Sequence, residues 1–255
     1  MSGPVLRPLR LGEILDVSFG LYRSLFLPLL VVTLVTRALP LAVSAYVESA
    51  GGMVANLPLY LGSLILDMVL GAIATAASTF IVSESYMGRR LTASEAFSRA
   101  GPFIGRLIGL GILTSFVIVL GFMLLIIPGV ILTCGLALST PAMVIESQAS
   151  ATAAMGRSWA LTRGFRTKIF VALVVVGFLM YLPFLALGGI AAVTLGSEPG
   201  AGGMTGFLGL TSLAAVLSSL IWPLFYCVLT VCYYDLRVRK EAFDLEVLAA
   251  GLAKA

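Results

Sequence analysis

The sequence contains no histidine, and only 11% of its 255 residues are charged. Histidine is the commonest general base near neutral pH and a common metal ligand, so its absence excludes the Ser-His-Asp arrangement and most zinc sites. A soluble domain carries about 25% charged residues, so the composition also excludes an ordinary water-soluble protein. The three cysteines, Cys134, Cys227 and Cys232, lie inside apolar runs and are expected to pack as small hydrophobic side chains.

The motifs of phosphate-binding loops and of paired-cysteine metal sites are also missing. The remaining candidates for chemistry are carboxylates that lie among arginines, where ion pairing explains them. We therefore predict no catalytic residue, no cofactor and no metal, in a protein that is not an enzyme. An enzyme that uses these carboxylates at the membrane surface is the weakest alternative. They are Glu13, Asp16, Glu84, Glu95, Glu146 and Asp235.

The chain is rich in long apolar segments. Hydrophobic residues make up 60% of the chain, and the mean hydropathy is +1.08. A helix of roughly 20 apolar residues crosses the hydrocarbon core of a bilayer. We predict an all-α polytopic bundle of six transmembrane helices that forms one integral membrane domain over residues 1–255. The fourth span follows Pro128-Gly129 and is short enough to be tilted or partly re-entrant. The spans are expected near 25–47, 57–82, 103–127, 129–145, 169–195 and 207–233.

The positive charges fall on one side of these spans. Of the 16 Lys and Arg residues, all except Arg37 fall on one side of the spans: before span one, after span six, or in and beside the connections between spans two and three and between spans four and five. The opposite loops contain Glu48 and Glu198 and no cation. Cytoplasmic loops carry the excess of Lys and Arg in membrane proteins. We therefore predict a multi-pass protein of the bacterial plasma membrane with both termini in the cytoplasm.

Each pair of spans follows a stretch with the pattern of an amphipathic helix. One begins near Leu11, one at the capping-box motif Thr92-Ala-Ser-Glu95, and one near Ser150 with Gly164 as its expected C-cap. Helices of this kind lie in the membrane interface. The chain thus resembles three copies of one unit, an interfacial helix followed by a transmembrane hairpin, starting near 11, 92 and 150. The alternative is that any helical hairpin needs such a lead-in.

Two charged residues, Arg37 and Asp67, lie deep within spans one and two. Because the two spans run antiparallel, a rise of about 1.5 Å per residue places both residues at similar depth, slightly to the outer side of the midplane. An isolated charge there costs at least ~2.5–3.5 kcal/mol. We therefore predict an intramembrane ion pair, or two charges that face one polar cavity. Such a pair either marks a substrate pathway or fixes how the two spans pack.

Small residues recur every four positions at the start of span three, at Gly101, Gly105 and Gly109. This spacing lets helices approach closely, so we predict helix packing there, within the bundle or between protomers. Hydroxyl side chains in the spans are more often interhelical hydrogen-bonding groups than ligand sites. They include Thr33, Thr36, Ser63, Thr75, Ser78, Thr114 and Ser115.

Three stretches resemble the bacterial glycerophosphoryl diester phosphodiesterase membrane domain family. They are LGEILDVSFGLYRSLFLPLL (11–30), IIPGVILTCGLALSTPAMVIE through RSWALTRGFRTK (126–168), and YYDLRVRKEAFDLE (233–246). In some relatives this membrane unit is joined to a catalytic barrel, which is missing here. The resemblance therefore implies a membrane module that handles or senses lipid without hydrolysis. Its motif residues are expected to build a cytoplasmic collar with cross-links such as Glu146 to Arg157 or Arg163, and Asp16 or Asp235 to a neighbouring Arg. The charged collar residues are Glu13, Asp16, Arg23, Glu146, Arg157, Arg163, Asp235, Arg237 and Arg239.

Two functions follow as the main alternatives. The first is a non-enzymatic membrane scaffold or accessory protein in lipid or envelope homeostasis. The second is a small transporter or lipid-translocating protein that uses a polar site around Arg37 and Asp67; a polar cavity that reaches Arg37 favours it, and a dry bundle counts against it. The expected partners are membrane lipids, a second copy of the chain or a protein at the cytoplasmic face. Nucleic acid is not among them.

Overall fold

The computed structural model describes residues 7–195 and 201–245, and within these ranges it contains helices and no strand. Six helical segments are long and apolar enough to cross a membrane, which confirms the predicted fold class. The first part comprises α1 (Leu11–Ser24), α2 (Phe26–Ser49), α3 (Gly52–Ala55) and α4 (Leu57–Tyr86). The second comprises α5 (Ala93–Ala100), a 3-10 turn (Gly101–Phe103), α6 (Ile104–Leu124), α7 (Ile126–Leu136) and α8 (Ser139–Ile145). The third comprises α9 (Ala151–Thr162), α10 (Arg166–Leu195) and α11 (Ala201–Glu241).

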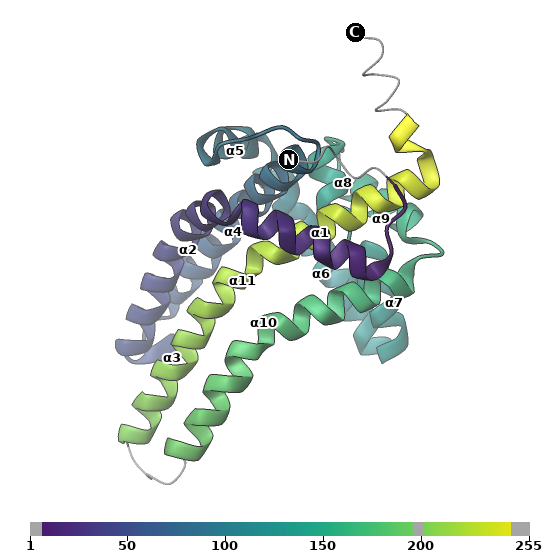
Figure 1. Cartoon of the computed structure of the whole chain (residues 1–255). Coiled ribbons are helices and arrows are strands. Elements are labelled where there is room, and N and C mark those ends of the chain that lie inside the picture. Colours follow the sequence, from purple (N-terminus) through teal and green to yellow (C-terminus); the bar gives the residue numbers. More distant parts are fainter. Residues whose placement is uncertain (1–6, 196–200, 246–255) are drawn as a thin grey trace.

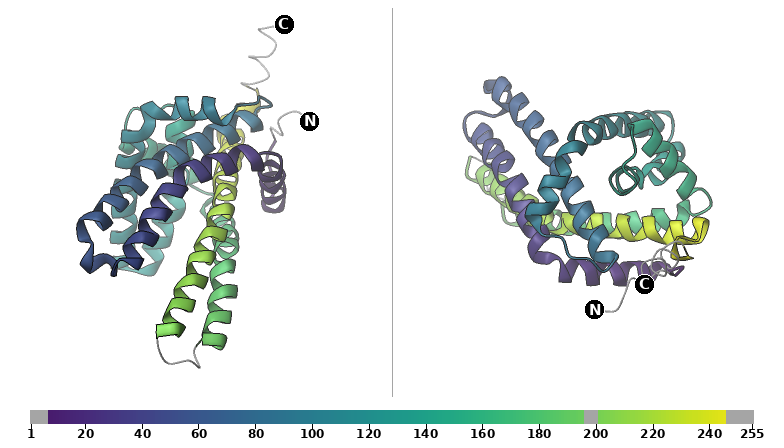
Figure 2. Two further views of the ribbon diagram at one scale, coloured as in Figure 1. Left: turned by 90° about the vertical axis from the view of Figure 1, so that its left-hand side faces the viewer. Right: turned by 90° about the horizontal axis from the view of Figure 1, so that it is seen from above.

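The long helices form antiparallel hairpins that extend from the end of the molecule that holds α1. Figure 2 (left) shows the pair α2 and α4 and the pair α10 and α11 running down from the level of α1. The helix α11 crosses the whole molecule, and in Figure 1 it lies between α2 and α10. At about 1.5 Å per residue its 41 residues span roughly 60 Å, twice the thickness of the hydrocarbon core. Its last turns therefore belong to the layer that contains α1.

The three amphipathic stretches form α1, α5 and α9. Thr92 and Glu95 make the reciprocal bonds of a capping box, with Thr92 N–H donating to Glu95 Oε2 at 2.9 Å and Glu95 N–H donating to Thr92 Oγ1 at 3.3 Å. The Ser150 hydroxyl accepts from the Ala153 N–H at 3.2 Å and caps α9. Gly164, just after α9, has a φ of +88°, a conformation that favours glycine.

The fourth membrane segment differs from its prediction in two respects. The turn before it lies at Leu125, whose backbone is extended, and Pro128 stands inside the first turn of α7, where a missing N–H costs little. The fourth segment therefore begins at residue 126, three residues before the predicted start at 129. The segment is also broken between α7 and α8. With 11 residues, α7 reaches only about 16 Å.

The glycines at the start of α6 do not pack against another helix of this chain. Gly101, Gly105 and Gly109 are exposed, and no heavy atom lies within 4 Å of the position that a Cβ would take at any of them. The prediction of close packing within the bundle is therefore wrong for these positions, because they lie on the outer face of the helix. Close approaches occur instead at Gly129, against the Phe122 ring, and at Gly135, against the Trp159 ring. Packing between protomers stays a prediction.

Candidate functional site: an ion pair in a membrane cavity

A cavity of about 600 Å³ opens between α2, α4, α10 and α11, and we refer to it as the membrane cavity. Tyr181 of α10 and Trp222 of α11 are part of its wall and are both exposed at the surface of the molecule. Both residues lie within candidate membrane spans, so the cavity reaches the surface of the molecule along these spans. The polar part of the lining includes Thr36, Arg37, Asp67, Ser78, Trp222 and Tyr226.

The two charges that the sequence places at one depth are in contact in this cavity. Arg37 Nη1 donates to Asp67 Oδ1 at 2.5 Å. The side chains remain 28% and 47% exposed respectively, so the pair is not sealed by protein. A guanidinium has five N–H donors, and an ionised carboxylate accepts at both oxygens. Within the described residues the pair satisfies one donor of Arg37 and one oxygen of Asp67, which leaves polar groups of both kinds for a ligand.

A chain of hydrogen bonds runs from this cavity to the far side of α4. The Thr75 hydroxyl donates its one hydrogen to the Gly71 carbonyl at 2.8 Å. The Tyr226 hydroxyl, 2.9 Å from Thr75 Oγ1, must therefore be the donor of that bond, and it accepts from the Trp222 indole N–H at 2.8 Å. The Arg37 guanidinium lies 6.0 Å from the centre of the Trp222 ring, at the limit of a cation–π contact. These contacts connect the neighbourhood of Arg37 through Trp222 and Tyr226 to Thr75 of α4.

The sequence does not single out Trp222 or Tyr226, although their spacing of four residues places them on one face of α11. Neither residue is charged, and aromatic side chains are ordinary in membrane spans. Only the packing of α11 against α4 shows that they share a cavity with Arg37 and Asp67. The Trp222–Tyr226 pair is therefore a finding of the structure.

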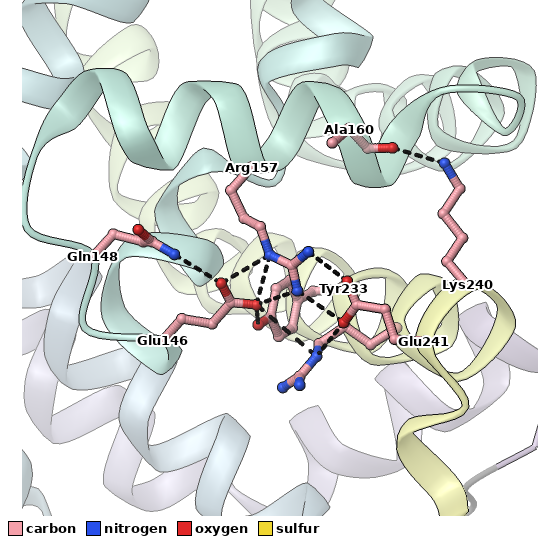
Figure 3. A network of polar contacts seen from close by, with 8 residues as sticks. Glu146, Gln148, Arg157, Ala160, Tyr233, Lys240 and Glu241 are labelled. Atoms are coloured by element: carbon pink, nitrogen blue, oxygen red, sulfur yellow. Dashed lines mark hydrogen bonds and ion pairs between the residues drawn. The ribbon is translucent and has the colours of Figure 1, made fainter. Parts of the chain in front are cut away.

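A second group of polar side chains joins α9 and α11 to the residues after α8 (Figure 3). Arg157 Nε donates to both Glu146 oxygens, at 2.9 and 2.8 Å, and Arg157 Nη2 donates to Glu241 Oε2 at 2.8 Å. The Tyr233 hydroxyl donates to Glu146 Oε1 at 2.6 Å. Arg157 of α9 thus links α11 to the residues after α8, and we call this group the collar network. Its members are Glu146, Gln148, Arg157, Tyr233, Arg237 and Glu241.

The environment of Glu146 favours its ionised form. Partial burial acts to raise the pKa of Glu146, but hydrogen bonds from Arg157, Tyr233 and Gln148 outweigh it, and the pKa lies below its usual value. Hydrogen bonds to Glu241 and Glu146 raise the pKa of Arg157, so this side chain stays charged. The network is therefore a satisfied set of charges, and its arrangement favours a structural role.

A lowered pKa makes a testable contribution to stability. The contribution of Glu146 is fully present above the unfolded pKa of about 4.5 and is lost as the pH falls through the lower folded value. We expect Glu146→Gln to reduce the free energy of unfolding by about 2 kcal/mol at pH 7, the effect of removing hydrogen bonds to a charged group. Circular dichroism of denaturation in detergent micelles checks this, and the difference from wild type should shrink steadily below pH 4.5. A difference independent of pH would contradict the assignment.

One collar carboxylate is almost completely buried. Asp235 is 1% exposed and accepts from Lys168 Nζ at 2.6 Å, from Arg239 Nε at 3.1 Å and from the Leu9 N–H at 2.7 Å. The Leu9 carbonyl in turn accepts from Lys168 Nζ at 2.6 Å and from Arg239 Nη2 at 2.7 Å. This Asp235 clamp fastens the segment before α1 to α10 and α11.

The other predicted collar residues lie at the same end of the molecule. Glu13 pairs with Arg7, and Arg237 pairs with Glu241 in the collar network. Asp16, Arg23 and Arg163 are exposed. Of the two partners predicted for Glu146, the structure selects Arg157, and of the two carboxylates predicted to meet an arginine, it selects Asp235.

Groups of His, Cys, Asp and Glu that could hold a metal ion do not occur among residues 7–195 and 201–245. The charged side chains of the membrane cavity are one cation and one anion, which together suit a ligand with charges of both signs.

A family model that describes a domain of unknown function (DUF7847) matches residues 95–236. The chain belongs to this family. The matched region contains the Asp235 carboxylate, the Trp222–Tyr226 wall of the membrane cavity and the collar network up to Tyr233, whereas Arg37, Asp67, Arg237 and Glu241 lie outside it. No curated protein and no solved structure matches the chain. The resemblance to the glycerophosphoryl diester phosphodiesterase membrane domain stays a prediction.

Proposed function

We propose that this protein binds a phospholipid by its headgroup in the membrane cavity and helps that headgroup to cross the bilayer. The observation that carries the proposal is the half-exposed Arg37–Asp67 pair in a cavity of about 600 Å³ between membrane-spanning helices. Charged groups inside a membrane are expensive, and they commonly mark the path of a polar substrate. This supports the transport alternative over a scaffold.

The two charges indicate the class of headgroup. Arg37 offers N–H donors to an anionic phosphate, and Asp67 offers its second oxygen to an ammonium. A phosphoethanolamine headgroup supplies both partners in one molecule, whereas a phosphoglycerol headgroup leaves the carboxylate without a cation. We therefore expect a preference for phosphatidylethanolamine. The apolar wall with Leu41 and Phe184 suits the start of the acyl chains.

Trp222 allows a direct test, because the chain has only two tryptophans and Trp159 lies outside the cavity. The variant Trp159→Phe leaves Trp222 as the single reporter in a phosphatidylcholine nanodisc. Phosphatidylethanolamine brominated near the headgroup end of its chains should quench Trp222 with saturation at low mole fraction. Brominated phosphatidylglycerol should quench only in proportion to its mole fraction. Equal, linear quenching by the two lipids would overturn the proposed binding.

Variants of the pair and of the cavity complete the test. Asp67→Asn should remove the preference for phosphatidylethanolamine, while the matched variant Asp16→Asn, at an exposed position, should retain it. Ser219→Trp fills the cavity without altering either charge. Translocation is measured in vesicles with fluorescent phosphatidylethanolamine and an impermeant reductant, which bleaches only the outer leaflet. Wild-type protein should expose the inner-leaflet pool of fluorescent lipid to bleaching, and Asp67→Asn and Ser219→Trp should each protect that pool. Equal bleaching with wild type and with both variants would contradict transport.

A further inference from the structure

A second cavity, also of about 600 Å³, lies between α4, α6 and the break between α7 and α8. Its polar lining consists of hydroxyl side chains alone, those of Thr75, Thr114, Ser115, Ser139 and Thr140, so we call it the hydroxyl cavity. We infer that it binds an uncharged, hydroxyl-bearing lipid. The inference does not rest on the function proposed for the membrane cavity, because it uses different residues and a different ligand class.

The strongest observation is the state of Ser139. This residue is 1% exposed, and its hydroxyl has no hydrogen-bond partner within the described residues. A helical serine usually donates to the carbonyl four residues earlier. Here that carbonyl belongs to Gly135 and already accepts from the Ser158 hydroxyl at 2.7 Å. The Ser139 hydroxyl makes no bond to this carbonyl and therefore keeps a free donor beside the cavity.

Thr114 gives a second, independent indication on the facing helix α6. Its Oγ1 is buried and has no partner among the described residues either. Threonines elsewhere in the spans are satisfied: Thr36 donates to the Val32 carbonyl at 2.7 Å, and Thr133 donates to the Gly129 carbonyl at 2.9 Å. Buried polar groups in native proteins nearly always have a partner, so two unsatisfied hydroxyls on one cavity point to a ligand.

The rest of the lining defines what that ligand is. No charged residue lines the cavity, so a phosphate or an ammonium would lose its hydration without gaining an ion pair. Most of the wall is apolar, and Met68 and Ile112, which are 41% and 60% exposed, place it within reach of the membrane. A lipid with a free hydroxyl and no charge satisfies both conditions. Diacylglycerol is the simplest molecule of this class and serves as the probe.

The test is photocrosslinking of the full-length protein in phosphatidylcholine nanodiscs. A diacylglycerol with a photoactivatable group in its chain should label α6 or α8, with the site located by fragmentation of the labelled peptide. Unlabelled diacylglycerol should compete. Triacylglycerol lacks the hydroxyl and phosphatidic acid carries a charge, so neither should compete. Competition by all three lipids to the same extent would overturn the inference in favour of nonspecific contact with the bilayer.

Hydroxyl deletions provide the matched controls. Thr114→Val with Ser139→Ala should weaken competition by diacylglycerol about tenfold, the combined effect of two neutral hydrogen bonds. Thr133 lies on α7, outside the lining of the hydroxyl cavity, so the control variant Thr133→Val should leave labelling unchanged. The proposal would be overturned if the double variant were labelled as strongly as wild type. It would also be overturned if no saturable labelling occurred, because the cavity then holds only water.

Discussion

Replacing Asp235 with alanine should produce the largest loss of stability of any single substitution considered for this protein. The carboxylate is buried, and it receives bonds from two cations and from the Leu9 N–H. Removing it leaves Lys168 and Arg239 without their anion, and breaking a buried pair from one side typically costs about 3–5 kcal/mol. Asp235→Asn should lose less, because an amide oxygen still accepts from Leu9.

The three cysteines supply the measurement. All of them are free and buried, so a thiol-reactive fluorophore labels the protein only as it unfolds. The Asp235→Ala variant should unfold at a temperature roughly 10 °C below wild type in the same detergent, given a few degrees per kcal/mol for a chain of this size. The control Asp16→Ala removes an exposed carboxylate from the same end of the molecule and should change little. Equal melting of the two variants would refute the clamp.

The clamp also predicts a local effect. Leu9 is 1% exposed and lies next to Arg10, which is exposed. If the bonds of Asp235 and its two cations hold Leu9, the Asp235→Ala variant should be cleaved by trypsin after Arg10 faster than wild type while the bundle is still folded. Unchanged cleavage together with a lowered melting temperature would mean that Asp235 stabilises α10 and α11 but does not hold the segment before α1.

Structural features that leave a hydropathy pattern, a capping motif or a charge pattern in the sequence were predictable from it. Hydropathy gives the six membrane segments, and the capping-box motif gives the beginning of α5. The contact between Arg37 and Asp67 follows from depth alone, because an unpaired charge inside a membrane is so unfavourable that few alternatives exist. A strong physical penalty thus makes a long-range contact predictable.

Contacts between residues whose burial the sequence does not reveal were not predictable. The Lys168–Asp235 pair joins residues 67 positions apart, in a collar rich in other cations. The spacing of Gly101, Gly105 and Gly109 resembles a packing motif, yet these residues face outward, because spacing does not say which face of α6 meets a neighbour. The hydroxyl cavity has no charged residue to indicate it in the sequence, since it is a space left between several elements rather than a property of one.

Removing both charges of the intramembrane pair should be less harmful than removing Arg37 alone. Arg37→Ala leaves Asp67 without its cation within the spans, and an isolated charge at that depth costs about 2.5–3.5 kcal/mol. The double variant Arg37→Ala with Asp67→Ala leaves no charge, so it should regain most of that loss in fluorophore-detected melting and in membrane yield. The matched pair Arg23→Ala with Asp16→Ala, both at exposed positions, should show no such recovery.

The same double variant separates the fold from the function. If the pair only fixes how α2 packs on α4, restored folding should come with unchanged quenching of Trp222 by brominated phosphatidylethanolamine. If the pair holds the headgroup, the double variant should fold yet lose saturable quenching, because the donors of Arg37 and the free oxygen of Asp67 are gone together. A double variant no more stable than Arg37→Ala would instead show that the two charges do not support each other, and the lipid site would then have to be sought away from this pair.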